Sequence, residues 1–373
     1  MVYNEYGKTG KKVSALGFGG MRFDTSRSKE ENAELLHHAN SKGINYFDTA
    51  PGYCSDHSED IFGIAFKNMP GQFYCSTKGM PVSFDTAAKA REAVMKSLDR
   101  LGVPKIDFYH VWCLRKMEHY ELAMKAGGQY EGLLKCKEEG LIDHIVFSSH
   151  QPGHEVKEIL DEGHFDGVLM GINVLNYPYR WEGVKAAAEG GYGVVAMNPL
   201  GGGVIPQHEK ELAFLASDGE TPTEAALRFI ISCPEVTVAL NGFTTHEHID
   251  TACRIADECR PLTEADMARI RENLGENMNE VCTACGYCEK DCPQQIPIPA
   301  YMMYYNNKQM FGVTDEEMKK KMREEREWQT LVGRKADAAD CTECGTCEEA
   351  CTQHLNIIDR LKEIAEWEKD CAD

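Results

Sequence analysis

Short apolar runs recur along most of the chain, and amphipathic stretches separate them. Eight of these runs have the length and the content of β-branched and aromatic residues that are typical of strands buried on both faces. They cover residues 15–19, 44–48, 73–77, 106–111, 144–148, 167–174, 193–197 and 236–240. Windows with a helical period lie between them, for example 29–42, 86–101 and 183–190. This alternation over about 270 residues predicts an α/β fold, a (β/α)8 TIM barrel.

An open, doubly wound sheet is the other arrangement that the same alternation of strands and helices allows. Such a sheet usually carries a glycine-rich phosphate loop directly after its first strand. The segment 16–20, LGFGG, lacks the spacing of that loop, and we interpret it as a tight turn. The barrel is therefore the preferred prediction.

The end of the chain differs in composition from the rest, which predicts a barrel domain at 1–275 and a smaller domain at 276–373. Eight of the sixteen cysteines form two runs in this tail, each with the spacing C-x2-C-x2-C-x3-C. The runs are Cys282, Cys285, Cys288 and Cys292, and Cys341, Cys344, Cys347 and Cys351. This spacing is that of bacterial ferredoxins and favours two [4Fe–4S] clusters. Two zinc sites with four thiolates each are the alternative.

In modules with this spacing the fourth cysteine of each run usually binds the other cluster. We therefore expect Cys351 to complete the cluster of the first run and Cys292 to complete that of the second. A helix is predicted at 314–330, between the runs. The tail resembles the small, mostly helical ferredoxin-like domains with two clusters that are appended to some oxidoreductases.

The chain is acidic, with a formal net charge of −20. This charge argues against nucleic acid and against an anionic membrane surface as partners. No window approaches the roughly 18 apolar residues of a membrane-spanning helix, and the first residues lack the apolar stretch of a signal peptide. We expect a soluble, cytoplasmic protein. In that compartment sixteen cysteines indicate metal or redox chemistry rather than disulfides.

Ionisable residues lie at three neighbouring strand ends, which is where barrels carry their chemistry. Asp48 closes the second predicted strand, and Tyr53 follows in its loop. Lys78 closes the third predicted strand, and His110 lies at the end of the fourth. Each residue alone has an ordinary structural explanation, such as a loop cap or a buried histidine. Together they predict one site at the barrel mouth.

From its start to about residue 260, the chain resembles the aldo-keto reductase family. The resemblance rests on the segments LGFGGMR, FDTAPGY, SEDIFG, STK, YHVW, VFSSH, MNPLGGG and LNGFTTHEH. It assigns the family's catalytic tetrad to Asp48, Tyr53, Lys78 and His110. By this resemblance Tyr53 gives a proton to a carbonyl oxygen, and Lys78 lowers the phenol's pKa from about 10. Asp48 holds Lys78, and His110 donates to the carbonyl oxygen or orients it.

The same resemblance implies an NAD(P)H cofactor as the source of hydride. The residues that it implies as cofactor contacts are Gly20, Met21, Asp48, Ser148, Ser149, Asn173, Pro199, Leu200, Gly202, Gly242, Thr244 and His248. Many members of the family carry an arginine for the 2′-phosphate where this chain has His248. A neutral imidazole is a poor substitute for a guanidinium fork, so the resemblance predicts no preference for NADPH.

The whole chain resembles aldo-keto reductases of anaerobes that carry a tail with two clusters. The predicted function is reduction of an aldehyde or ketone, or oxidation of the alcohol, with NAD(P)H and an appended electron-transfer domain. The alternative is a ferredoxin-linked electron-transfer protein with a flavin or another redox partner at the barrel mouth, although no motif indicates a flavin. The expected partners are a small-molecule carbonyl or alcohol and a redox protein that docks on the iron–sulfur domain. The segment 112–128 is the expected specificity loop.

Overall fold

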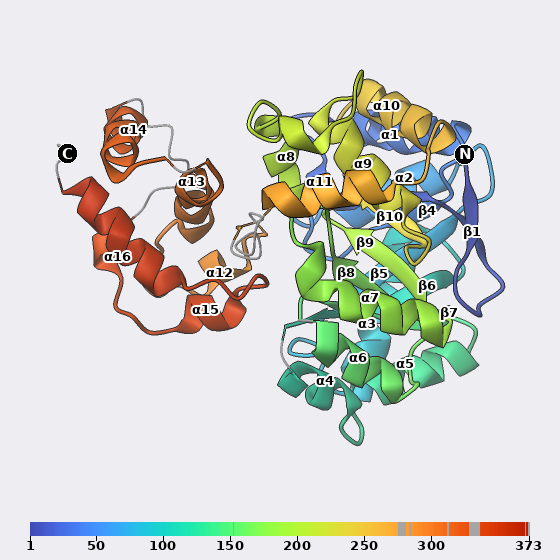
Figure 1. Cartoon of the computed structure of the whole chain (residues 1–373). Helices are drawn as coiled ribbons and strands as arrows, with labels where there is room; N and C mark the ends of the chain where they lie inside the picture. The colour runs from blue at the N-terminus through green and yellow to red at the C-terminus, as the bar shows by residue number, and fades with distance from the viewer. Residues whose placement is uncertain are drawn as a thin grey trace. The chain divides into compact units, whose positions relative to one another are not determined.

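The computed structural model describes the chain except for residues 116, 152, 275–280, 283–284, 312, 328–335, 370 and 372–373. It divides into two compact units (Figure 1). The first unit contains Met1–Leu200 and Leu215–Met267, and the second contains Gly201–Phe214 and Ala268–Asp373.

Eight parallel strands form the centre of the first unit and close into a barrel in the order β10-β3-β4-β5-β6-β7-β8-β9. They are β3 (Leu16–Gly19), β4 (Tyr46–Asp48), β5 (Tyr74–Gly79), β6 (Ile106–Leu114), β7 (Ile142–Ser149), β8 (Gly167–Gly171), β9 (Gly193–Met197) and β10 (Val238–Asn241). Each overlaps one of the eight apolar runs. The predicted (β/α)8 barrel is confirmed, and the open sheet is excluded because β10 pairs with β3.

Helices surround these strands (Figure 1). They are α1 (Lys29–Ser41), α2 (Ser58–Phe66), α3 (Ala87–Leu101), α4 (Met117–Met124), α5 (Gln129–Glu138), α6 (Gly153–Asp161), α7 (Tyr177–Gly190), α9 (Pro222–Ser232) and α10 (His246–Asp257). Local signals in the sequence fix several of their starts. Ser28 forms a capping box with Glu31 at α1, and Thr221 forms one with Glu224 at α9. These pairs satisfy backbone N–H groups that have no partner within the helix.

A hairpin that the sequence analysis did not predict precedes the barrel. It consists of β1 (Tyr3–Glu5) and β2 (Lys12–Ser14). Tyr6, in its turn, is fully buried, and its ring centroid lies 4.2 Å from that of Phe108 inside the barrel. A side chain at Gly193 would meet this ring at 2.2 Å. The N-terminal end of the barrel is therefore closed by Tyr6.

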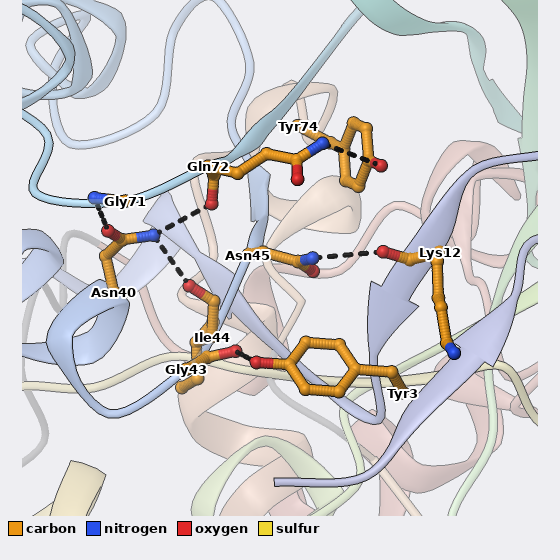
Figure 2. A pocket seen from close by; sticks show the side chains of 9 residues that line it. All are labelled: Tyr3, Lys12, Asn40, Gly43, Ile44, Asn45, Gly71, Gln72 and Tyr74. Atoms are coloured by element: carbon orange, nitrogen blue, oxygen red, sulfur yellow. Dashed lines mark hydrogen bonds between the residues drawn. The ribbon is translucent and has the colours of Figure 1, made fainter.

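Figure 2 shows a hollow beside the hairpin, lined by polar side chains. The Asn40 amide donates to the carbonyls of Ile44 and Gln72, at 3.0 and 3.1 Å. The Asn45 amide donates to the Lys12 carbonyl at 3.0 Å. These side-chain donors already bond to backbone carbonyls. The residues that line the hollow therefore hold loops together at this end of the barrel.

The second unit is helical in its described residues. Its helices are α8 (Val204–Gln207), α12 (Tyr287–Lys290), α13 (Ile298–Phe311), α14 (Asp315–Glu327), α15 (Thr346–Ala350) and α16 (Ile357–Glu368), and α11 (Glu264–Leu274) spans the boundary between the units. Met318, Met322, Ile364 and Trp367 pack in a core that also includes cluster cysteines. The predicted helix at 314–330 corresponds to α14, and 328–330 lie outside the described residues. None of the described helices is both long and apolar enough to cross a membrane.

Candidate active site and iron–sulfur centre

The lumen of the barrel changes from aromatic to polar along the strands. Tyr46, Tyr74 and Phe108 pack in the core cluster near the closed end. Because side chains alternate along a strand, the residues two positions further on also face the lumen. Those residues are Asp48 on β4, Ser76 on β5 and His110 on β6.

A buried hydrogen-bond network joins these three side chains to Lys78. The Oδ1 atom of Asp48 accepts a hydrogen bond from Ser76 Oγ at 2.7 Å, and its Oδ2 atom pairs with Lys78 Nζ. Ser76 Oγ lies 2.9 Å from His110 Nε2. A carboxylate only accepts, so the one hydroxyl proton of Ser76 goes to Asp48. His110 Nε2 must therefore donate to Ser76.

Burial controls the protonation of this network. It lowers the pKa of Lys78, and the adjacent Asp48 carboxylate opposes that shift. Burial and the Lys78 ammonium together hold the pKa of His110 well below its usual value, so the imidazole is neutral near pH 7. The barrel thus keeps one ion pair and one neutral histidine away from water.

Tyr53 lies beside this ion pair, in the loop after β4. Its half-buried ring has its centroid 5.5 Å from Lys78 Nζ. Burial and the negative charge of Asp48 raise the pKa of Tyr53 well above its usual value. The lowering of this pKa that we expect from Lys78 stays a prediction, because burial and Asp48 dominate the net shift. The phenol keeps its proton and remains able to donate it.

The backbone of the Tyr53 loop is strained. Cys54, Ser55 and Asp56 all have positive φ values, of 53°, 54° and 67°. Asp56 is held by Arg100 Nη1 at 2.7 Å and by the Gly52 N–H at 2.9 Å. Such strain persists where the surroundings over-determine a conformation, and it is common at functional sites.

His110 does not lie at the end of its strand, as the sequence analysis expected. The strand β6 continues to Leu114, so His110 is in its middle and fully buried. The inward-facing position nearer the mouth belongs to Trp112, whose ring is perpendicular to that of Tyr53 at a centroid distance of 5.6 Å. The expected loop 112–128 is also wrong in part, because it contains the end of β6 and the helix α4.

A bulge accounts for the unexpected end of β6. The register with β7 shifts between Val111 and Leu114, and Cys113 has a φ of 62°. The Cys113 N–H donates to Ser148 Oγ at 2.9 Å. Bulges at barrel rims re-aim side chains. The alternation of residues 108, 110 and 112 could have identified Trp112 as an inward-facing residue. The predicted strand ended at residue 111 and therefore excluded it.

The serine and asparagine side chains implied as nicotinamide contacts lie at strand ends and are buried. Ser148 Oγ accepts the hydrogen bond of the Cys113 N–H. Ser149 Oγ accepts that of the Gln151 N–H at 3.0 Å. Asn173 follows β8, and its amide donates to the Asn198 carbonyl at 3.1 Å. All three side chains therefore already have bonds within the barrel.

Gly20 and Met21 lie directly after β3. The Gly20 carbonyl accepts a hydrogen bond from Ser58 Oγ at 2.8 Å. A Cβ atom at Gly20 would lie only 2.4 Å from this Ser58 Oγ. Only glycine allows this approach, which ties the first loop to the start of α2. Met21 is exposed.

Gly242, Thr244 and His248 lie at the start of α10 or just before it. The imidazole of His248 is exposed, and its Nδ1 atom lies 3.2 Å from Thr244 Oγ1. Arg27, which the sequence analysis did not select, donates to the Thr244 carbonyl at 3.0 Å. A helix N-terminus with an adjacent arginine suits a phosphate group.

The pyrophosphate-loop residues are divided between the units. Pro199 and Leu200 follow β9 in the barrel unit. Gly202 has a φ of 70° and belongs to the second unit.

The cysteines of the second unit gather in two sets that combine both runs. One apolar cavity is lined by Cys292 of the first run together with three cysteines of the second, Cys341, Cys344 and Cys347. In the other set, burial and neighbouring thiols raise the pKa of Cys288; those neighbours are Cys282, Cys285, Cys351 and Cys347. Thus Cys292 lies beside the second run and Cys351 beside the first, as a crossed arrangement requires.

The surroundings of these thiols suit an iron–sulfur cluster. Gly286 and Gly345, each after the second cysteine of its run, have φ values of 78° and 81°. The Leu355 N–H donates to Cys351 Sγ at 3.4 Å. Among the described residues, no three His, Cys, Asp or Glu side chains are close enough to hold a single metal ion. Four thiolates around a four-iron cluster are spaced more widely than four around one zinc ion.

Comparison with known proteins agrees with both halves of this description. Residues 15–274 match the model of the aldo/keto reductase family, and residues 281–358 match that of the 4Fe-4S dicluster domain. The uncharacterised oxidoreductase YqkF of Bacillus subtilis (strain 168) is 24% identical over 312 residues, which are 74% of this chain and 98% of that protein. D-threo-aldose 1-dehydrogenase of a Pseudomonas species is 25% identical over 248 residues, 58% of this chain and 74% of that protein.

Solved structures show the same barrel fold. Aldo-keto reductase AKR11C1 from Bacillus halodurans (holo form) is 24% identical, with a TM-score of 0.63 over 74% of this chain and 97% of that one. An aldo-keto reductase from Klebsiella pneumoniae in complex with NADPH is 18% identical, with a TM-score of 0.61 over 72% of this chain and 94% of that one. The family match covers well over half of the residues. This chain therefore belongs to the aldo/keto reductase family of oxidoreductases and carries a 4Fe-4S dicluster domain near its C-terminal end.

Proposed function

We propose that this protein reduces an aldehyde or ketone with a nicotinamide cofactor, or oxidises the corresponding alcohol, and that its second domain transfers electrons. The observation that carries the proposal is the buried ion pair of Asp48 and Lys78 beside Tyr53. Burying two charges is costly, and a barrel used only as a scaffold gains nothing from it. This argues against the alternative of a simple electron-transfer protein.

The chemistry follows from the charges. A bound nicotinamide supplies a hydride to the carbonyl carbon, and negative charge develops on the carbonyl oxygen. Tyr53 gives that oxygen its proton as a general acid. Lys78, held by Asp48, stabilises the phenolate that remains. Each of these roles is a proposal for this chain.

The proposed cofactor is NAD(P)H. The Klebsiella pneumoniae relative binds NADPH. A dinucleotide of this class fits the helix N-terminus beside Thr244 and His248 in this chain, which suits a phosphate group. The residues proposed to hold it are those implied by the sequence, with Arg27 as an additional cation near the adenosine end.

For the second domain we propose two [4Fe–4S] clusters. The cavity lined by Cys292, Cys341, Cys344 and Cys347 supports one of them. The neighbouring thiols of Cys282, Cys285, Cys288 and Cys351 support the other. Nicotinamide moves two electrons as hydride, whereas each cluster moves one. We therefore propose that the clusters serve a separate redox protein, in the reducing cytoplasm that sixteen cysteines favour.

An anaerobic assay of the full chain tests this function. Purified protein is given NADH or NADPH with a panel of aldehydes and ketones, and separately with viologen dyes. Oxidation of the nucleotide with carbonyls and little with dyes supports the reductase. Rapid dye reduction without carbonyl turnover would favour the electron-transfer alternative. Iron and sulfide analysis of the same sample tests the clusters.

A further inference from the structure

The proposed reaction requires a hydrogen-bond donor at the carbonyl oxygen in addition to Tyr53, and the resemblance gave that role to His110. The structure leaves His110 without a proton to offer. A neutral imidazole carries one N–H, and that of His110 goes to Ser76. Its other nitrogen, Nδ1, is buried and meets no partner with good hydrogen-bond geometry in the described part of the chain, and the Phe147 backbone also interacts with the ring. In either tautomer the single N–H of the neutral ring faces a group of the chain, Ser76 or the Phe147 backbone, and none is left for a substrate.

The position of His110 in the barrel points to the same conclusion. His110 is paired in register with Lys78, which is itself buried. Both therefore lie below the rim. The next inward-facing residue toward the mouth is Trp112, two positions further along β6.

Trp112 has the features that a carbonyl donor needs. Its side chain is half-buried and perpendicular to the Tyr53 ring, at a centroid distance of 5.6 Å. Neither its indole N–H nor the Tyr53 hydroxyl has a hydrogen-bond partner among the residues that the structure describes. The two rings that carry these donors are thus in edge-to-face contact.

The backbone around Trp112 is fixed. Cys113 has a positive φ in the bulge, and its N–H is bonded to Ser148 on the neighbouring strand. A donor helps a reaction most when it does not have to move as charge develops. The bulge therefore supplies the rigidity that such a donor needs.

We propose that Trp112 donates its indole N–H to the substrate carbonyl oxygen, and that His110 is a positioning residue that orients Asp48 through Ser76. This inference rests on the proposed carbonyl reduction. The indole stabilises the oxygen as it becomes negative and transfers no atom. Tyr53 remains the source of the proton.

Kinetics of the full chain with its clusters test the proposal. We expect Trp112→Phe, which keeps an aromatic ring but removes the N–H, to lower kcat by about 10²–10³. Trp112→His restores a donor and should recover part of the loss. Trp181→Phe, on α7 and in contact with Tyr177, is a matched control that should behave as wild type. His110→Gln should lose less than Trp112→Phe and should change the pH profile, because it disturbs the Ser76–Asp48 pair.

A binding measurement adds a readout that does not depend on turnover. Acetate, whose carboxylate mimics the charged oxygen, is titrated calorimetrically into the protein with oxidised nucleotide. Trp112→Phe should weaken acetate binding about tenfold, the effect of one hydrogen bond, and leave nucleotide binding unchanged. The proposal is overturned if Trp112→Phe keeps wild-type kcat and acetate affinity, or if His110→Gln alone loses a hundredfold. A wild-type protein that reduces no carbonyl would instead refute the proposed function, and this inference with it.

Discussion

The carboxylate of Asp48 and the ammonium of Lys78 form an ion pair that is almost completely closed off from water. Breaking a buried pair from one side leaves an uncompensated charge and typically costs about 3–5 kcal/mol of stability. We expect Lys78→Met to lower the thermal midpoint of the barrel and to abolish carbonyl reduction. Asp48→Asn combined with Lys78→Met should recover most of the stability and none of the activity. A double variant as unstable as Lys78→Met would contradict this account of the pair.

Tyr53→Phe should lower carbonyl reduction by about 10²–10⁴, the usual loss for a general acid. Nucleotide binding should remain near wild type, because the change removes one hydroxyl. The matched control is Tyr3→Phe, which removes a hydroxyl bonded to the Gly43 carbonyl at the closed end of the barrel. Steady-state rates and calorimetric titration of the nucleotide check both variants. Near-normal turnover in Tyr53→Phe would refute its role as the acid.

Stability should fall in mild acid because His110 is buried in its neutral form. Its pKa in the folded chain is well below that in the unfolded chain, which is about 6.5. As pH falls below that value, the unfolded state takes up a proton that the folded state does not, and stability decreases. We expect the difference in thermal midpoint between wild type and His110→Gln to shrink, or to reverse, from pH 7.5 to pH 5. A difference that is independent of pH would show that His110 titrates normally.

NADH should bind at least as tightly as NADPH, because His248 lacks the guanidinium fork that a 2′-phosphate favours. Arg254 cannot easily replace it, since its guanidinium pairs with Glu224 and with Glu258. Calorimetric titration with both nucleotides measures the ratio. A hundredfold preference for NADPH would contradict the prediction. If Arg27→Ala abolished that preference, the 2′-phosphate contact would be Arg27.

The full chain should bind about eight iron atoms, and a chain that ends at residue 335 should bind almost none. The shorter chain keeps the whole first run but lacks Cys351, which lies beside that run in the structure. It should also become sensitive to proteases, because metal binding and folding are coupled in small sites. Cys371→Ser in the full chain, outside both runs, is the control and should keep all the iron. Four irons in one intact cluster in the shorter chain would refute the crossed arrangement.

The barrel was predictable because strands buried on both faces appear in the sequence as short apolar runs. The rim of the barrel was not. The last residues of β6, Trp112 to Leu114, depend on a bulge that is held by Ser148 on the next strand. A local sequence pattern cannot predict a hydrogen bond between residues so far apart in the chain. The predicted strand therefore ended too early, and His110 was placed at the barrel mouth. Ser76 could have been found, because it lies two residues before Lys78 on one face of β5.

The two cysteine runs illustrate the opposite case. Their spacing carries the information about which thiols share a cavity, so the sequence predicted the grouping of Cys292 with the second run. The terminal hairpin lies between these extremes. Its strands, Tyr3–Glu5 and Lys12–Ser14, are too short for a clear period, although the turn between them contains two glycines.

Tyr6 closes one end of the barrel, and this has a consequence for the order of events in turnover. A barrel that is closed at the base has a single entrance, so every molecule that reaches Lys78 must arrive and leave through the same opening. Whatever occupies the deeper position must enter first and depart last. Binding of the two reactants and release of the two products should therefore follow a compulsory order. Product-inhibition patterns of the forward reaction should be those of an ordered mechanism and not of a random one.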